Sequence, residues 1–169
     1  MRFHHMCIVT TDISEAIRLW RDVLGFNLDI QMGLPDGPEP APAVFADQGL
    51  LDDLYKVKGA RSKLATFTSK DGAHIEVLQC EAPQTLRTPE EYRRYGRSGI
   101  QELGLAVEDI DAVWEKVRAA GYETQTDYVW DCSTVGRSFI FYDFDGNMIQ
   151  IWQGIDASEI VWPEDSKAA

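Results

Sequence analysis

The chain has 169 residues, of which 44% are hydrophobic and 26% are charged, so it suits one domain or two small modules with a packed interior. The formal net charge of −12 makes binding to nucleic acids or anionic membranes unfavourable, because both carry negative charge. No apolar run reaches the ~20 residues that a membrane-spanning helix requires.

Two features of the sequence indicate a cytoplasmic protein. The N-terminal residues Met1-Arg2-Phe3-His4-His5 lack the apolar core of a signal peptide. The three cysteines, Cys7, Cys80 and Cys132, lie far apart and form no CxxC pair. An odd number of cysteines without a secretory signal favours a reducing compartment, in which we expect all three to be buried thiols.

Hydrophobic periodicity and turn residues predict two βαβββ halves. With boundaries good to ~2–4 residues, the expected elements in chain order are a strand at 2–10, a helix at 12–24, a strand at 26–33, a long loop at 34–62, strands at 63–69 and 73–80, a short helix at Pro89–Tyr92, a strand at 99–107, a helix at 109–120, and strands at 122–128, 136–142 and 147–153. The expected organisation is a first module at 1–80, a linker at 81–98, a second module at 99–155 and an acidic tail at 156–169.

The two halves are an internal repeat. Both expected helices begin near an Asp and end at a Gly followed by an aromatic residue, from Asp12 to Gly25-Phe26 and from Asp109 to Gly121-Tyr122. The last strand of each half follows the pattern D-G-x-x-I-[EQ]-[VI]-x-Q, at 71–79 and at 145–153. An Asp-Gly pair before an apolar run is typical of a hairpin turn that leads into a strand.

The repeat places four polar side chains at equivalent positions. His5 and Glu102 each lie seven residues before the Asp at the start of a helix, and Glu76 and Gln150 each lie four residues after a hairpin Gly. Side chains alternate along a strand, so these residues share faces with apolar or small neighbours such as Gly104. Taken singly, each residue is most simply a surface or satisfied core residue, but together they suggest a common site.

A divalent metal ion would explain the two carboxylates in this set. A carboxylate buried without a partner costs several kcal/mol, so Glu76 and Glu102 require a counter-charge or a proton. His5, Glu76, Glu102 and Gln150 each offer a lone pair, and a doubly charged cation would balance the two carboxylates. The set is therefore a candidate metal site.

The sequence resembles the vicinal oxygen chelate superfamily over about residues 1–155. The opening, from Met1-Arg2-Phe3-His4-His5 through Asp12-Ile13 to Val23-Leu24-Gly25-Phe26, resembles the start of a bacterial glyoxalase I, and some features are closest to methylmalonyl-CoA epimerase-like members. The segment Phe139–Ile151 is similar to the family's closing motif F-x-D-P-D-G-x-x-I-E-I. The resemblance implies an α+β fold in which two βαβββ modules form a cupped mixed sheet around a central pocket that holds a divalent metal.

The resemblance also implies roles for individual residues. His5 matches the first ligand position and Glu76 the second, whereas Glu102 stands where the family commonly has His and Gln150 where it commonly has Glu. One nitrogen and three oxygen donors make a hard site, which favours Mg²⁺, Mn²⁺, Co²⁺ or Ni²⁺, with Zn²⁺ or Fe as less suited alternatives. His74 shares the face of Glu76, so it is a candidate to replace one of the ligands, to support them from behind or to act as a base, and the alternative is a surface His at the end of a strand.

The reaction expected from the resemblance is that of an isomerase, epimerase or lyase. Such an enzyme polarises a small oxygenated substrate and moves a proton on the adjacent carbon, with Glu76 and Glu102 as the candidate catalytic groups. A ring-cleaving dioxygenase is disfavoured because it needs two His and one carboxylate for Fe(II). A metal-free sequestering protein of the bleomycin-resistance type is the alternative, in which aromatic side chains line the pocket: Trp130, Trp152, Tyr128 and Tyr142.

Other expectations concern the substrate and the assembly. The long Pro-containing loop at 33–61 is typical of a lid or binding segment. Four linker arginines are candidates for contact with an anionic group or for a solvated surface: Arg87, Arg93, Arg94 and Arg97. Tyr142 and Trp152 are candidate substrate contacts. We expect a small-molecule substrate and a homodimer, with the modules paired either within a chain or across the dimer.

Overall fold

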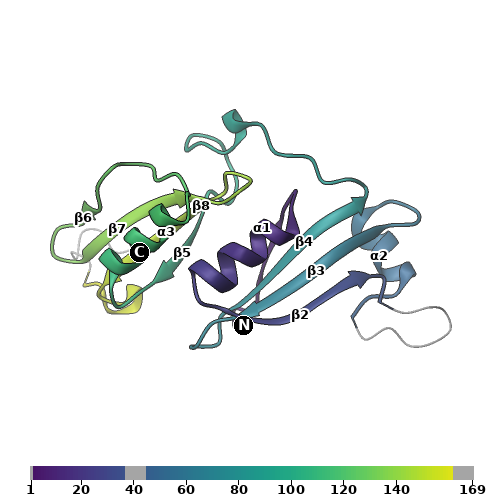
Figure 1. The fold of residues 1–169 in the computed structure, drawn as a ribbon, viewed down its shortest axis with the longest axis horizontal. Helices are drawn as coiled ribbons and strands as arrows, with labels where there is room; N and C mark the ends of the chain where they lie inside the picture. Colours follow the sequence, from purple (N-terminus) through teal and green to yellow (C-terminus); the bar gives the residue numbers. More distant parts are fainter. Residues whose placement is uncertain (1, 37–44, 162–169) are drawn as a thin grey trace, which may run out of the picture. The chain divides into compact units, whose positions relative to one another are not determined.

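The computed structural model of the chain describes residues 2–36 and 45–161. Its contacts define two compact units, one consisting of Met1–Arg94 and Asp143–Gly146 and the other of Tyr95–Tyr142 and Asn147–Ala169. Within the described residues, each unit contains one four-stranded sheet (Figure 1).

The first unit is a βαβββ module with one additional helix. Its elements are β1 (Met6–Val9), α1 (Ile13–Ile17), the π-helical continuation η1 (Arg18–Val23), β2 (Asn27–Leu34), α2 (Gln48–Tyr55), β3 (Arg61–Thr68), β4 (His74–Ala82) and the short helix η2 (Glu90–Tyr92). The strands lie in the order β1-β4-β3-β2, with β1 parallel to β4 and the other pairs antiparallel.

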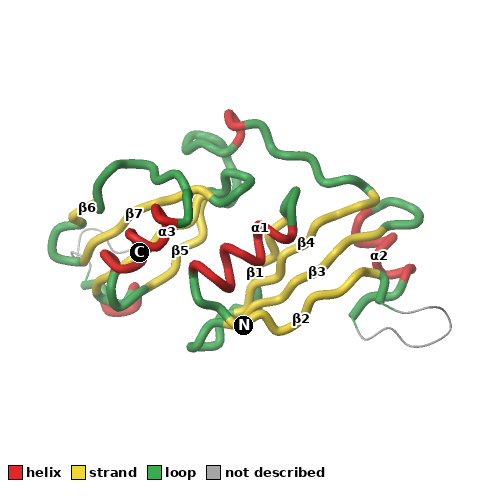
Figure 2. The backbone as a smooth tube through the Cα atoms, viewed as in Figure 1, coloured by secondary structure: helices red, strands yellow, loops and turns green. Residues whose placement is uncertain are grey.

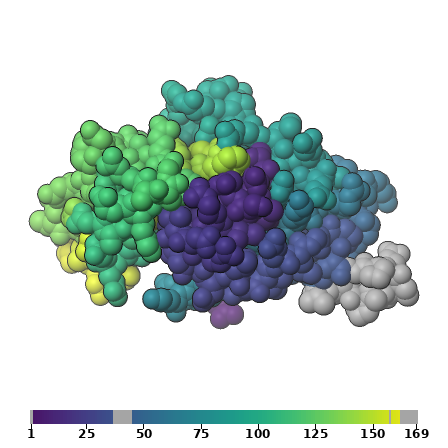
Figure 3. Space-filling view, viewed as in Figure 1, coloured from purple at the N-terminus to yellow at the C-terminus, as the bar shows by residue number. Residues whose placement is uncertain are grey.

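Helix α1 and its continuation η1 cover one face of this sheet. The side chain of Asp12 accepts hydrogen bonds from the backbone N–H groups of Ser14 and Glu15, which caps the start of the helix. Trp20 is 2% exposed and its ring lies 6.3 Å from that of Phe67 on β3. Figure 1 shows α1 over β3 and β4, and purple atoms of the N-terminal segment lie at the front of the space-filling view (Figure 3). The opposite face of the sheet, where it is not covered by the helix that carries Leu51, is therefore the face available for a site.

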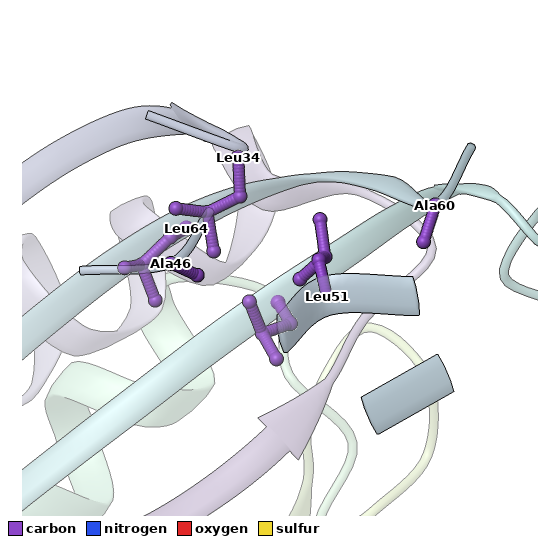
Figure 4. Packing of buried hydrophobic residues seen from close by; sticks show 6 residues of the cluster. Leu34, Ala46, Leu51, Ala60 and Leu64 are labelled. Carbon is purple, nitrogen blue, oxygen red and sulfur yellow. The ribbon is translucent and has the colours of Figure 1, made fainter. Parts of the chain in front are cut away.

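Helix α2 corrects the prediction of a long loop at 34–62. It begins at the N-cap Asp47, whose side chain accepts from the backbone N–H of Leu50, and it appears as a red segment between β2 and β3 (Figure 2). Leu51 is 1% exposed and belongs to a buried cluster with Leu34 and Leu64 (Figure 4). The helix was missed because its apolar side is narrow and Gly49 interrupts it. The prolines at 38, 40 and 42 lie outside the described residues.

The second unit repeats the βαβββ order. Its elements are β5 (Glu102–Ala106), α3 (Ile110–Ala119), β6 (Trp130–Asp131), β7 (Gly136–Tyr142), β8 (Met148–Gly154) and the short helix η3 (Ala157–Glu159). The strand order β5-β8-β7-β6 matches that of the first unit, and β5 is parallel to β8. Trp114 of α3 packs edge-on against Phe139 of β7, so α3 covers one face of this sheet as α1 covers the other sheet.

The predicted strand at 122–128 is wrong. In this segment only an isolated bridge joins Thr124 to Phe141, and the strand proper is the two-residue β6 farther along the chain. The hydroxyls of Thr124 and Thr126 donate to the backbone carbonyls of Thr126 and Tyr128, both at 2.7 Å. Such local side-chain bonds compete with a strand ladder, which is why the β-rich composition did not produce one.

The last Gln of the repeated motif joins the final strand of each unit to the start of its helix. Gln79 accepts from the backbone N–H of Ile13 at 3.1 Å and donates to the carbonyl of Thr11 at 2.9 Å. Gln153 accepts from the N–H of Ile110 at 3.3 Å and donates to the carbonyl of Glu108 at 2.6 Å. These bonds satisfy a helix N–H that has no partner within its own helix, and they explain why both halves carry this Gln.

The turn at Asp143–Gly146 packs within the first unit. The buried carboxylate of Asp145 accepts from the hydroxyl of Thr10 at 2.6 Å and from the backbone N–H of Thr11 at 3.0 Å. Arg87 lies 3.7 Å from the same carboxylate and donates to the carbonyl of Phe144. Arg94 pairs with Glu90, and Arg93 donates to the carbonyl of Thr88, so these linker arginines also have partners in the protein.

The expected α+β class and the two βαβββ modules are confirmed, as is the short helix in the linker. In the described parts of the chain, no helix has both the length and the apolar character needed to cross a membrane.

Candidate functional site

The open face of the first sheet brings His5, His74 and Glu76 together. Glu76 is the cross-strand partner of Cys7, and His5 lies two residues before Cys7, so all three share the face opposite α1. The Nε2 atom of His5 lies 3.7 Å from one carboxylate oxygen of Glu76, and the Nε2 atom of His74 lies 3.7 Å from the other. The two imidazole rings are 6.4 Å apart. The first unit thus brings together two of the four predicted site residues, His5 and Glu76, with His74 beside them.

The carboxylate of Glu76 lies in a poorly hydrated environment. Its side chain is 15% exposed, and its ion-pair partners within residues 2–36 and 45–161 are the two histidines. Thr66 is its partner on the other side, in β3, and the hydroxyl of Thr66 is buried without a hydrogen-bond partner in the described residues. A buried carboxylate beside an unsatisfied hydroxyl is a favourable place for a cation, because both groups offer oxygen lone pairs.

The same face carries the thiols of Cys7 and Cys80, and the phenol of Tyr55 on α2 lies close to both. Desolvation, followed by the negative charge of Glu76, raises the pKa of the Cys7 thiol to about 11 although Cys7 is exposed on its strand. Burial raises the pKa of Tyr55 to about 12, and its hydroxyl donates to that of Ser62 at 3.0 Å. Both groups remain protonated and uncharged at neutral pH, so they add no counter-charge for a cation. Cys7 is not the buried thiol that the sequence predicted.

The second unit places Glu102 and Gln150 in the same arrangement. Gly104 pairs with Gln150 as Cys7 pairs with Glu76, and Glu102 lies two residues before Gly104 as His5 lies two before Cys7. A Cβ atom added to Gly104 would lie 3.8 Å from the amide oxygen of Gln150, so the glycine leaves space beside that oxygen. The register confirms that the positions are equivalent in the two repeats.

Two predicted aromatic contacts share the face of Glu102 and Gln150. Tyr142 is the partner of Met148, next to Glu102, and its hydroxyl donates to the side-chain oxygen of Gln125 at 2.8 Å. Trp152 lies two residues beyond Gln150 on β8, and its indole N–H donates to the carbonyl of Ile155 at 3.2 Å. Both side chains are partly exposed, so they are accessible to a ligand on this face.

The donor types in each unit, taken by itself, are those that hard divalent cations prefer. In the described part of the chain, no three His, Cys, Asp or Glu side chains are grouped so as to hold a metal ion. His5 and Glu76 provide a nitrogen and carboxylate oxygens, and Glu102 and Gln150 provide carboxylate and amide oxygens. These residue types are ligands of Mg²⁺, Mn²⁺, Co²⁺ and Ni²⁺.

One polar residue of this face was missed by the sequence analysis. The hydroxyl of Tyr95 donates to the carboxylate of Glu102, seven residues along the chain. That hydrogen bond, followed by burial and by the negative charge of Glu102, raises the pKa of Tyr95 to about 12. Nothing in the periodicity pointed to Tyr95, because it lies in the linker before the strand.

The comparisons with known proteins show the family of the chain. The family model for the Glyoxalase/Bleomycin resistance protein/Dioxygenase superfamily matches residues 2–151. The chain belongs to this superfamily. No curated protein sequence matches the chain.

Solved structures with the same fold include proteins of several kinds. A glyoxalase family protein from Bacillus cereus has a TM-score of 0.74 at 18% identity, with 92% of this chain and 95% of that chain covered. A fosfomycin resistance protein, FosX, from Listeria monocytogenes, complexed with Mn(II) and sulfate, has a TM-score of 0.58 at 17% identity, covering 91% and 93%. TnmS3, an antibiotic binding protein from Streptomyces sp. CB03234, has a TM-score of 0.53 at 16% identity, covering 91% and 98%. At these identities the likeness shows a shared fold.

Proposed function

We propose that the protein is a metal-dependent isomerase, epimerase or lyase that acts on a small carbonyl or hydroxy compound. The observation that carries the proposal is the pair formed by His5 and the largely buried Glu76, which the second unit repeats at the same register with Glu102 and Gln150. Membership of the superfamily supports it, and FosX shows that a protein of this fold binds Mn(II).

His5, Glu76, Glu102 and Gln150 are the proposed ligands. The two carboxylates balance the charge of a divalent ion, and the amide oxygen of Gln150 is a neutral donor. When bound, the metal supplies Lewis-acid polarisation of a substrate oxygen.

The proton transfer is assigned to the carboxylates of the chain. A base that removes a proton from the carbon next to a carbonyl must lie about 3 Å from that carbon, which is hydrogen-bonding distance. Glu76 and Glu102 are the proposed bases, because a carboxylate oxygen that the site holds only loosely, or releases, can accept that proton. The imidazole of His74 lies near one oxygen of Glu76 and helps to orient that carboxylate.

Metal titration tests this proposal. Metal-stripped protein is titrated with Mn²⁺, Co²⁺ and Ni²⁺, and we expect binding that raises the melting temperature. Glu76→Gln should weaken the affinity at least ~10-fold. Glu81→Gln is the matched control, because Glu81 lies on the same strand but is exposed and paired with Lys63. Equal affinities in wild type and Glu76→Gln would remove Glu76 from the site.

A metal-free binding protein is the second candidate. Trp130, Trp152 and Tyr142 are all partly exposed and share one face of the second sheet, which suits stacking against a flat ligand. TnmS3 shows that the fold occurs in an antibiotic binding protein. If none of the three ions binds or changes the melting temperature, the enzyme proposal fails and this candidate replaces it.

A further inference from the structure

The loop before β5 is built so that Tyr95 returns to Glu102. Gly96 and Gly99 have φ angles of 100° and 150°, a region that side chains rarely adopt, so the chain can turn sharply there. The amide of Gln101 donates to the carbonyl of Arg97 at 2.8 Å, which closes the turn. The phenol of Tyr95 consequently reaches back to the carboxylate at the start of the strand.

The hydrogen bond occupies one oxygen of Glu102 only. The hydroxyl of Tyr95 donates to Oε2 of Glu102, so the other oxygen, Oε1, takes no part in this hydrogen bond. A carboxylate held in this way can offer its other oxygen to a cation, whereas a free carboxylate can rotate or bind through both oxygens. Binding through a single oxygen leaves more coordination positions for a substrate.

The residues around Tyr95 and Glu102 indicate that their hydrogen bond is part of the site rather than a chance contact at the surface. Glu102 and Tyr142 are the partners of Met148 from opposite sides, and Tyr142 is close enough to Tyr95 to affect its pKa. Gln150 lies two residues farther along the same face. Tyr95 itself is 58% exposed, so it is not needed for the packing of the core.

We infer that Tyr95 is a positioning residue, which holds Glu102 so that it binds a divalent ion through one oxygen. The inference rests on the proposed function, because it assigns Glu102 to the metal site. Outer partners of metal ligands typically contribute 10–100-fold to metal affinity. Loss of the hydroxyl should therefore weaken binding without unfolding the protein.

A double-mutant cycle with Mn²⁺ as the probe tests the inference. Affinities and the electron paramagnetic resonance spectrum of bound Mn²⁺ are measured for wild type, Tyr95→Phe, Glu102→Gln and the double variant. We expect Tyr95→Phe to weaken Mn²⁺ binding about 10-fold and to alter the spectrum, with a melting temperature close to that of wild type. In the Glu102→Gln background, the same change should have no further effect, because its partner carboxylate is gone.

The control and the opposing outcomes are distinct. Tyr92→Phe removes the hydroxyl of another exposed tyrosine in the same linker and should leave the affinity unchanged. If wild type binds Mn²⁺ but Tyr95→Phe binds it equally well, or if the Tyr95 and Glu102 effects add, the role of Tyr95 is refuted and the proposed function stands. If wild type does not bind Mn²⁺, the proposed function fails and the role of Tyr95 fails with it.

Discussion

Replacement of Gln79 by Ala is expected to lower the free energy of unfolding by about 2–3 kcal/mol. The change removes two hydrogen bonds, to the N–H of Ile13 and the carbonyl of Thr11, each worth about 1 kcal/mol between neutral groups. The N–H of Ile13 lies at the start of a helix in a partly buried place, so the loss of its partner adds up to about 1 kcal/mol.

Urea unfolding followed by circular dichroism measures this change, provided that the slope of the transition stays constant. Gln153→Ala is the matched variant, and its loss should be smaller, about 1–2 kcal/mol, because water can replace the more exposed bonds of Gln153. Lys70→Ala, at an exposed position, should change stability by less than about 0.5 kcal/mol. A loss below about 0.5 kcal/mol for Gln79→Ala would refute the assigned role of the repeated Gln.

Three further predictions address single groups. Asp145→Ala should cost about 2–4 kcal/mol in the same unfolding assay, because the buried carboxylate holds two threonines, and a loss under about 1 kcal/mol would show that these bonds contribute little. The backbone N–H of Ala60, with the side chain of Gln48, lowers the pKa of Asp52. The stabilisation from this carboxylate is therefore present above about pH 4 and is lost as the pH falls through the folded pKa. The difference in stability between wild type and Asp52→Asn should narrow as the pH falls below 4, and a difference that stays unchanged from pH 5 to pH 2 would exclude the charge as its source. Cys7 should react with iodoacetamide about 100-fold more slowly at pH 8 than an ordinary thiol, because its pKa of about 11 is two units above the usual 9.0. Glu76→Gln should speed this reaction, which mass spectrometry measures. An unchanged rate would mean that the carboxylate of Glu76 does not act on the thiol of Cys7.

The repeat in the sequence predicted the fold because the same local signals occur twice. An Asp starts each helix, a Gly in the left-handed region follows the end of each helix, and an Asp-Gly turn precedes each last strand. The same repeat predicted that Glu76 and Gln150 hold equivalent positions, and the strand registers agree. The strand predicted at 122–128 failed because local side-chain hydrogen bonds of its threonines compete with a strand ladder.

Other features could not be predicted because they depend on tertiary contacts. Helix α2 is stabilised by the burial of Leu51 rather than by its own sequence, which contains Gly49. The carboxylate of Asp145 was predicted as part of a turn, but its partners Thr10 and Thr11 lie more than a hundred residues away along the chain. Tyr95 was missed because a loop, with no periodicity of its own, brings it to Glu102.

The proposed metal site is tested most directly by crystals grown with Mn²⁺ and measured at the manganese absorption edge. The account predicts one anomalous peak about 2.0–2.4 Å from an imidazole nitrogen of His5 and a carboxylate oxygen of Glu76, with oxygens of Glu102 and Gln150 completing the protein ligands. No peak at His5 and Glu76, in crystals of protein that has been saturated with Mn²⁺, would contradict the central claim.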